Sequence, residues 1–161
     1  MTMIAHKLGR GTAAIFLVLM ALLLAQGSLG NSQGSIIVDG HERTYELHVP
    51  PGYKGEQAVP LVVALHGRGG TGHGTVGLTH FDDVADAHGF LIAYPDGLNA
   101  SWADGRGATP SDTDGIDDIK FLSELIRKLA RDYKIDSLRV FVTGYSNGGF
   151  MSQRVACELS G

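Results

Sequence analysis

The sequence is poor in cysteine, with Cys157 standing alone among 161 residues. A disulfide within the chain is therefore excluded, and a buried apolar core must stabilise the fold. In an exported protein an unpaired cysteine can indicate a bond to a partner. We favour the other interpretation, in which Cys157 is a small buried hydrophobe on a helix.

Neither sign of charge is in large excess, because 13 Lys and Arg face 17 Asp and Glu, which gives a formal net charge of −4. This mild acidity gives no reason to expect nucleic acid or anionic lipid as a partner. The hydrophobic share of 43% is ordinary for a globular domain. Glycine is abundant, at 23 residues, which indicates a fold that depends on tight loops.

Apolar runs are short, whereas a helix that spans a bilayer needs about 20 residues. The run from Ala13 to Ala25 follows basic residues and precedes small ones. This pattern predicts a signal peptide at residues 1–27, whose end could instead be residue 30, and hence a secreted protein, extracellular or periplasmic. An uncleaved membrane anchor is the alternative. After cleavage we expect no stable membrane span.

Strands are indicated by β-branched runs between turn residues. Residues 35–39 and 43–49 predict two strands around a tight turn, and the second alternates polar and apolar residues as a half-exposed antiparallel strand does. Residues 61–65, 90–94 and 139–143 are mostly apolar, which predicts strands buried on both faces of a parallel sheet.

Helical periodicity lies between these strands. One helix is predicted to begin with Thr79 as its cap and to end at Gly89, and a second to run from about 115 to 133. A third begins at Asn147, with an apolar stripe formed by Met151, Val155 and Leu159. Strands that alternate with helices predict an α/β fold with right-handed crossovers.

Four acidic residues gather around the start of the second helix: Asp112, Asp114, Asp117 and Asp118. A calcium loop is one interpretation. It fails the EF-hand pattern, because Pro110 and Phe121 stand where the first and last ligands belong. Helix capping and attraction to the helix dipole explain these acids more simply.

The motif Gly-x-Ser-x-Gly occurs at residues 144–148, where the sequence reads GYSNGG. A predicted strand precedes it and a predicted helix follows it, and this context places a nucleophilic serine, here Ser146, on a strained turn. Glycine at 144 and 148 lets the strand and the helix approach, and the amide N–H of Asn147 points towards a developing oxyanion. A structural glycine-rich turn is the alternative. A second match, at 30–34, lacks this context.

The stretch HGRGG, residues 66–70, directly follows the predicted strand at 61–65. A second oxyanion donor is expected after an earlier strand, and we assign it to the backbone N–H of Arg68. His66 is interpreted as a hydrogen-bonding residue that orients this loop, not as the catalytic base. A phosphate-binding loop is disfavoured, because neither the dinucleotide spacing nor the Lys-Ser/Thr of a P-loop is present.

The remaining histidines and aromatic residues leave two questions. His73, His80 and His88 show no ligand-like grouping, so they are interpreted as surface or packing residues and no metal site is predicted. Trp102 and Tyr94 form either a sugar platform or part of the core, and the sequence leaves both open.

Five blocks carry a resemblance to a known family: YELHVPPGY, PLVVALHGRGG, GFLIAYPDGLNASWADGR, DDIKFLSELI and RVFVTGYSNGGFMSQRVACEL. Together they resemble the secreted polyhydroxybutyrate depolymerase and feruloyl esterase-like group of α/β-hydrolases, over nearly everything after Ser35. The resemblance implies Ser146 as the nucleophile and the amides of Arg68 and Asn147 as oxyanion donors. Position 68 departs from some relatives, which carry Cys there, so a disulfide found in them cannot form. Trp102, His66 and Tyr145 are expected near the substrate.

The expected protein is therefore a secreted serine esterase that forms an acyl-enzyme on Ser146 and needs no cofactor. Its expected substrate is a polyester, or a feruloyl or acetyl ester of a polysaccharide. A non-catalytic polymer-binding module and a peptidase of the same fold are the alternatives. The oligomeric state stays open.

The order of the triad predicts something further. In this fold the acid and the histidine follow the serine, yet residues 147–161 contain no histidine. We therefore expect residues 35–161 to be the N-terminal part of a single α/β-hydrolase domain. A bare apolar sheet edge at 139–143 would make this chain poorly soluble, and it would be essentially inactive alone.

Overall fold

The structure, a computed structural model, describes residues 31–159, so the predicted signal peptide lies outside the described residues. One five-stranded sheet has the order β1-β2-β4-β3-β5. Its strands are β1 (Ser32–Val38), β2 (His41–His48), β3 (Val59–Leu65), β4 (Leu91–Pro95) and β5 (Ile135–Gly144). All five predicted strands are thus confirmed, with bounds that differ by a few residues.

The sheet is antiparallel at one side and parallel at the other. β1 and β2 form a hairpin, β2 is antiparallel to β4, and β3 is parallel to both β4 and β5. The carboxyl ends of β3, β4 and β5 therefore meet at one edge of the sheet. In parallel sheets this edge is where ligands and reacting groups gather.

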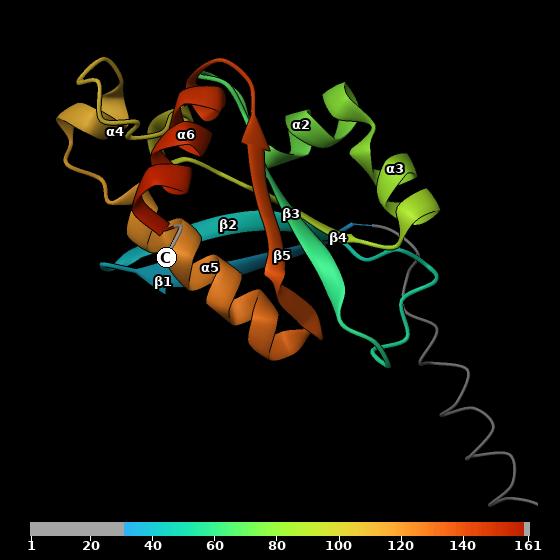
Figure 1. Cartoon of the computed structure of the whole chain (residues 1–161). Helices are drawn as coiled ribbons and strands as arrows, with labels where there is room; N and C mark the ends of the chain where they lie inside the picture. Colours follow the sequence, from blue (N-terminus) through green and yellow to red (C-terminus); the bar gives the residue numbers. More distant parts are fainter. Residues whose placement is uncertain (1–30, 160–161) are drawn as a thin grey trace, which may run out of the picture.

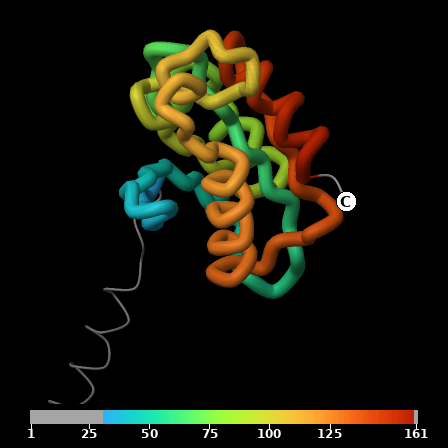
Figure 2. Tube along the Cα trace, turned by 90° about the vertical axis from the view of Figure 1, so that its left-hand side faces the viewer, coloured from blue at the N-terminus to red at the C-terminus, as the bar shows by residue number. Residues whose placement is uncertain are grey.

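Helices cover both faces of this sheet (Figure 1). α2 (Gly72–Thr79) and α3 (Phe81–His88) lie on one face, and α5 (Asp118–Asp132) and α6 (Asn147–Leu159) lie on the other. A 3-10 turn, η1 (Leu98–Ala100), and a short helix, α4 (Pro110–Thr113), lie in the connection after β4. Figure 2 shows α5 in front of the strands, as the outer layer of that face. The predicted α/β architecture is confirmed.

The main core lies between the sheet and α5 with α6. Side chains of α5 that face the sheet are fully buried, namely Phe121, Leu122, Leu125 and Leu129. They meet Leu61, Leu65 and Leu91 of the central strands, which explains why β3 and β4 read as apolar runs. Tyr94 and Ala85 belong to a smaller cluster under α2 and α3.

Three expectations about helices need correction. α2 was not predicted, because its three glycines hide the helical pattern. Thr79 does not cap α3: His80 occupies that position in the left-handed region, at φ 51°, and the Thr79 hydroxyl accepts only a long 3.4 Å bond from the Phe81 N–H. The second predicted helix starts at Asp118, because Gly115 adopts φ 67° and the Asp117 side chain caps the Lys120 N–H.

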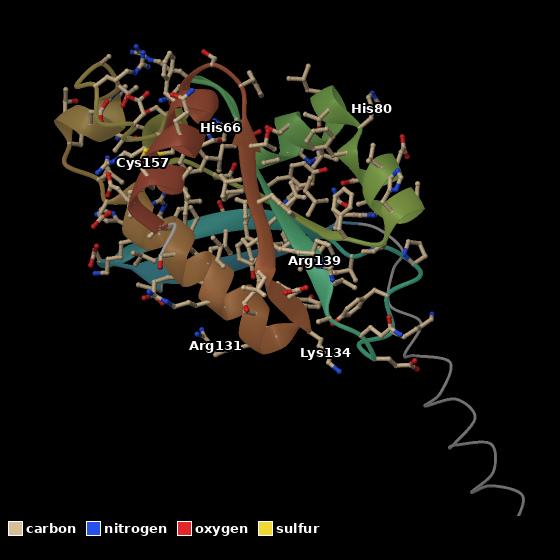
Figure 3. The ribbon with its side chains drawn as sticks, viewed as in Figure 1. His66, His80, Arg131, Lys134, Arg139 and Cys157 are labelled. Atoms are coloured by element: carbon tan, nitrogen blue, oxygen red, sulfur yellow. The ribbon has the colours of Figure 1, made fainter. Side chains whose placement is uncertain are left out.

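Three expectations about burial were wrong. β5 is an edge strand of the described sheet, as the expected bare edge at 139–143 requires, but its two faces are only partly covered, and Phe141 is 55% exposed. Cys157 is exposed, because it lies two residues after the buried Val155 and so points away from the apolar stripe of α6 (Figure 3). Leu159, expected on that stripe, is 37% exposed.

Candidate active site

Ser146 lies on the turn between β5 and α6, at the carboxyl edge of the sheet. Its φ of 51° is in the left-handed region, which an L-residue with a side chain rarely adopts. Such strain persists only where the surroundings impose it, and it collects at functional sites. Ser146 is exposed and borders an open depression of about 490 Å³ together with Thr143, Gly149 and Phe150. Its hydroxyl is therefore accessible to a ligand.

The two motif glycines allow this turn to form. A Cβ at Gly148 would lie 2.4 Å from the carbonyl oxygen of Leu65, and a Cβ at Gly144 would lie 2.6 Å from the carbonyl carbon of Gly148. Both clashes involve backbone atoms of packed elements, and displacing such atoms costs much more free energy than rotating a flexible side chain. The spacing of the motif thus follows from the close approach of β5, α6 and the end of β3.

The loop after β3 lies against the serine turn. The Tyr145 N–H donates a long 3.4 Å hydrogen bond to the Leu65 carbonyl. A Cβ at Gly67 would lie 2.8 Å from the Tyr145 ring and 3.4 Å from the Cβ of Ser146. Residues 66–70 and the serine turn are therefore in direct contact, as the assignment of an oxyanion donor to this loop requires.

The amides of Arg68 and Asn147 are the two candidate donors in this region. Within residues 31–159 neither N–H donates a hydrogen bond to the protein. The neighbouring amides are occupied, since the Gly69 N–H donates to Ala100 at 2.7 Å and the Gly70 N–H donates to Gly67 at 3.0 Å. Asn147 is the first residue of α6, where helix N–H groups lack an intrahelical partner. Two amides without a protein partner thus lie where the order of elements predicts oxyanion donors, one directly after Ser146 and one in the loop after β3.

His66 supports this loop from inside the protein. Its ring is fully buried, Nδ1–H donates to the Gly67 carbonyl at 2.7 Å, and Nε2 accepts the Gly97 N–H at 2.9 Å. These partners fix the neutral tautomer, and burial lowers the pKa of His66 below its ordinary value, although nearby carboxylates oppose the change. With both ring nitrogens engaged, His66 cannot take the proton of Ser146.

Trp102 lies directly beneath the same loop. It is fully buried, its indole N–H donates to the His66 carbonyl at 2.9 Å, and the two ring centroids are 4.9 Å apart. Tyr94 is also fully buried, which excludes the sugar-platform interpretation of this aromatic pair. Tyr145 differs from them, because it is 40% exposed beside the serine.

The connection after β4 contributes polar residues that the sequence did not reveal. The Asn147 side chain accepts the Trp102 N–H at 2.8 Å and donates to the Trp102 carbonyl at 3.1 Å and to Asp104 at 2.6 Å. Asp104 also accepts two side-chain bonds from Arg106, at 3.0 and 2.8 Å. Burial alone would raise the pKa of Asp104, but these hydrogen bonds outweigh it and lower the pKa. In the sequence, residues 101–106 (SWADGR) contributed only to the family resemblance, and nothing in them singled out Asp104 or Arg106.

Asp118 corrects the interpretation of the acidic cluster. Asp117 is the helix cap, but Asp118 is fully buried, accepts a 2.6 Å bond from Arg43 of β2 and accepts the Ala103 N–H at 2.7 Å. Burial raises the pKa of Asp118, opposed by the charge of Arg43 and by the Ala103 bond. This carboxylate therefore anchors the connection after β4 to the sheet, a role that helix periodicity could not predict.

The histidines considered as metal ligands lie apart from this site. His73 bonds Glu46 at 2.8 Å, His80 joins α2 to α3, and His88 ends α3. Figure 3 shows His80 on the α2–α3 side of the sheet and His66 beside α6. Across residues 31–159 no three His, Cys, Asp or Glu side chains are placed to hold one metal ion.

Comparisons with known proteins agree with this geometry. The family model described as "Esterase PHB depolymerase" matches residues 43–160. A putative esterase NocK of Nocardia uniformis subsp. tsuyamanensis is 31% identical over 124 residues, which cover 76% of this chain and 36% of that protein. Feruloyl esterase C of Emericella nidulans is 30% identical over 123 residues, which cover 71% of this chain and 41% of that protein. The chain spans less than half the length of these curated relatives.

Solved structures show the same fold. A thermostable esterase superposes with a TM-score of 0.66 at 25% identity, over 81% of this chain and 38% of that one. An acetyl xylan esterase from Aspergillus awamori superposes with a TM-score of 0.60 at 23% identity, over 80% of this chain and 47% of that one. The fold of the described residues is thus that of α/β-hydrolase esterases.

Proposed function

The chain belongs to the esterase PHB depolymerase family, and from this premise we propose that it serves carboxylic ester hydrolysis, with Ser146 as the nucleophile. The observation that carries the proposal is one strained, accessible serine next to an amide N–H without a protein partner, with a second such amide in the adjoining loop after β3. A turn that only connected a strand to a helix would need neither a strained serine nor amides without a partner.

The reaction follows from these positions. The Ser146 oxygen attacks the ester carbonyl carbon, and the amides of Arg68 and Asn147 hold the negative charge that develops on the carbonyl oxygen. The proton of Ser146 passes to a histidine other than His66, and the alcohol leaves to give an acyl-enzyme. Water then attacks the acyl carbon and releases the acid. No step requires a metal or an organic cofactor.

The substrate we propose is a polyester, or a feruloyl or acetyl ester attached to a polysaccharide. Relatives named acetylxylan esterase and feruloyl esterase, together with the name of the matching family, support this range. Tyr145 and Phe150 are side chains placed to meet an acyl group, because both are exposed and close to Ser146. His66 and Trp102 are proposed to act from beneath the site, through the loop that they support.

We also propose that the protein is exported. The proposal rests on residues 1–27, which have the order of a signal peptide. As a separate finding, none of the helices within residues 31–159 combines the length and the hydropathy that crossing a bilayer requires. N-terminal sequencing of protein recovered outside the cytoplasm is expected to give Ser28 or Asn31 as the first residue. Membrane-bound protein that retains Met1 would contradict this.

The acylation step can be tested without a catalytic histidine by replacing the nucleophile. In the double variant Ser146→Cys/Cys157→Ser the single thiol lies on the turn before α6, whereas the unchanged chain has its single thiol at exposed Cys157 within α6. A thiolate attacks p-nitrophenyl butyrate, expels p-nitrophenolate and leaves a thioester that mass spectrometry detects. Alkylation by iodoacetamide measures thiolate reactivity without forming a carbonyl oxyanion. The ratio of the acylation rate to the alkylation rate therefore measures how much the oxyanion donors accelerate acylation.

We expect this ratio to be about 10²-fold higher at position 146 than at Cys157, because one oxyanion donor is worth about 10² to 10³ in rate. Arg68→Ala, added to the double variant, should keep the ratio, whereas Arg68→Pro removes the N–H and should lower it by a similar factor. Equal ratios at the two thiols would refute the proposal and favour a non-catalytic binding module. Acylation by a p-nitroanilide as fast as by the ester would favour a peptidase.

A further inference from the structure

We propose that Asp104 and Arg106 are positioning residues that orient the Asn147 amide and thereby set the rate of acylation at Ser146. The inference rests on the proposed function and adds to it a device outside the Gly-x-Ser-x-Gly motif. Neither residue lies in β5 or α6, so both act on the serine turn only through their contacts with Asn147 and α6.

The first step is the fixed orientation of Asn147. This residue is almost fully buried, and its side-chain oxygen and nitrogen make three hydrogen bonds, all with Trp102 and Asp104. An amide side chain that accepts and donates at once cannot flip or rotate without losing a bond. Because the same residue supplies the candidate oxyanion N–H, fixing its side chain restrains the direction of that N–H.

The second step is the charge on Asp104. Its side chain is fully buried, and its oxygens accept bonds from both the backbone and the side chain of Arg106 as well as from Asn147. These bonds favour the carboxylate, so the 2.6 Å bond from Asn147 is charge-assisted at neutral pH. A charge-assisted bond is shorter and stronger than a neutral one, so the bond to Asp104 is the strongest of the three hydrogen bonds of the Asn147 side chain.

The third step is the attachment of Arg106 to α6. Its guanidinium lies 3.5 Å from the ring centroid of Phe150, which is one turn along α6 from Asn147. One turn further, Arg154 donates a 2.7 Å bond to the carbonyl of Ala103. The connection at 102–106 therefore holds α6 at three successive turns. This bracing opposes any rotation of the helix start that would turn the Asn147 N–H away from the carbonyl oxygen.

A purely structural role predicts a different result from a positioning role, and the chain offers a matched control. Asp112 also accepts bonds from this connection, at the amides of Gly105 and Ala108, but no bond joins it to Asn147 within the described residues. Asp104→Asn and Asp112→Asn each remove one carboxylate charge from the same segment. Only the first should disturb the oxyanion amide.

The experiment adds Asp104→Asn, Arg106→Gln or Asp112→Asn to the Ser146→Cys/Cys157→Ser chain and measures acylation by p-nitrophenyl butyrate and alkylation by iodoacetamide. We expect Asp104→Asn to lower the ratio of the two rates about tenfold, since misplacement of a reacting group by about 1 Å can cost about 10²-fold. Arg106→Gln should lower it less, and Asp112→Asn should leave it unchanged. Thermal unfolding of each variant records any loss of stability separately.

The outcomes separate the two proposals. If the parent double variant shows no preference for acylation, the proposed function fails, and this inference fails with it. If the parent shows the preference and Asp104→Asn keeps it, the function stands and the positioning role is wrong. Equal losses in Asp104→Asn and Asp112→Asn would also overturn the inference, because they would show a general loosening of the connection.

Discussion

At the scale of the residue, the serine turn depends as much on absent side chains as on present ones. Gly144 and Gly148 occupy positions where a Cβ would meet backbone atoms at 2.6 and 2.4 Å. Ser146 keeps its left-handed φ because the elements on either side are locked by this contact. The cost of the strained residue is thus offset by packing nearby.

Substitution of Gly148 by Ala is expected to destabilise the protein by about 1–3 kcal/mol, the range for overpacking of a tight interior. Gly77→Ala is the matched control, because Gly77 lies inside α2 with nothing within 4 Å of the added methyl group. That change should stabilise by about 0.5–1 kcal/mol through helix propensity. Urea unfolding midpoints measure both, and equal effects would show that the predicted clash is absent.

His66 should make stability depend on pH in a predictable direction. Burial lowers its pKa in the folded state below the ordinary value of 6.5, so the unfolded chain binds a proton more readily. The stability contributed by neutral His66 is fully present above pH 6.5. It is lost as the pH falls from 6.5 towards the lowered folded pKa, by at most about 1.4 kcal/mol per pH unit.

The comparison with His66→Asn isolates this group, because all other titrating residues are unchanged. The variant should be less stable at pH 7.5, since Gly97 loses its acceptor, but its stability should fall less between pH 6.5 and 5. Chemical unfolding at several pH values provides the measurement. Parallel pH profiles for the two proteins would show that His66 does not titrate differently on folding.

At the scale of the element, apolar runs predicted the strands well, because β3 and β4 are buried within the sheet and bounded by turn residues. The same reasoning overestimated the burial of the two faces of β5, since a well-covered apolar strand and a partly covered one carry the same local pattern. It also missed α2, whose glycines have low helix propensity and which forms because Thr71 caps it and Gly72 fits against Tyr94. Tertiary contact decided both cases.

The residues of the candidate site also fall into two groups, those that a local sequence pattern predicts and those that only tertiary contacts define. The motif located Ser146 and the glycines, because local chain geometry dictates them, and the order of elements located the loop of Arg68. Asp104 and Asp118 carry no local pattern, since their partners lie on other elements, 43 residues away at Asn147 and 75 away at Arg43. Only the folded structure brings such pairs together.

The buried pair of Arg43 and Asp118 joins β2 to α5 and holds the connection after β4 through the Ala103 N–H. Asp118→Asn leaves the Arg43 cation buried without a counter-charge, which should cost about 3–5 kcal/mol. The exposed pair of Arg127 and Glu124 is the control, and Glu124→Gln should cost no more than about 1 kcal/mol. Urea unfolding measures both variants.

A double replacement, Arg43→Met with Asp118→Leu, provides the complementary result. It removes both charges together, so much of the stability lost in Asp118→Asn should return. Continued loss of the full 3–5 kcal/mol in the double variant would mean that the bonds from Arg43 to Asp96 and over the Phe121 ring matter more than the charge balance.

At the scale of the whole molecule, the described sheet has two edge strands, β1 and β5. β1 pairs only with β2 in a hairpin, and β5 pairs only with β3, so within the described residues no strand pairs with the outer side of either. A groove of about 640 Å³ lies beside the β5 edge, between β5, α5 and α6, and apolar side chains line much of it, among them Ile126, Val140 and Val155. Unpaired strand edges with apolar neighbours promote association between chains.

The chain is therefore expected to self-associate through β5, and a charge placed at this edge should weaken the association. Leu138 on β5 is 92% exposed, so Leu138→Lys should leave the fold intact and put a cation where a second edge would pair. Leu78→Lys is the control, because Leu78 is 62% exposed on α2, on the other face of the sheet, and the change in net charge is identical. Sedimentation velocity over a range of concentrations should show larger species for the unchanged chain and for Leu78→Lys, and mainly monomer for Leu138→Lys. Equal reduction by both lysines would mean that net charge alone governs solubility and that the β5 edge is not the contact.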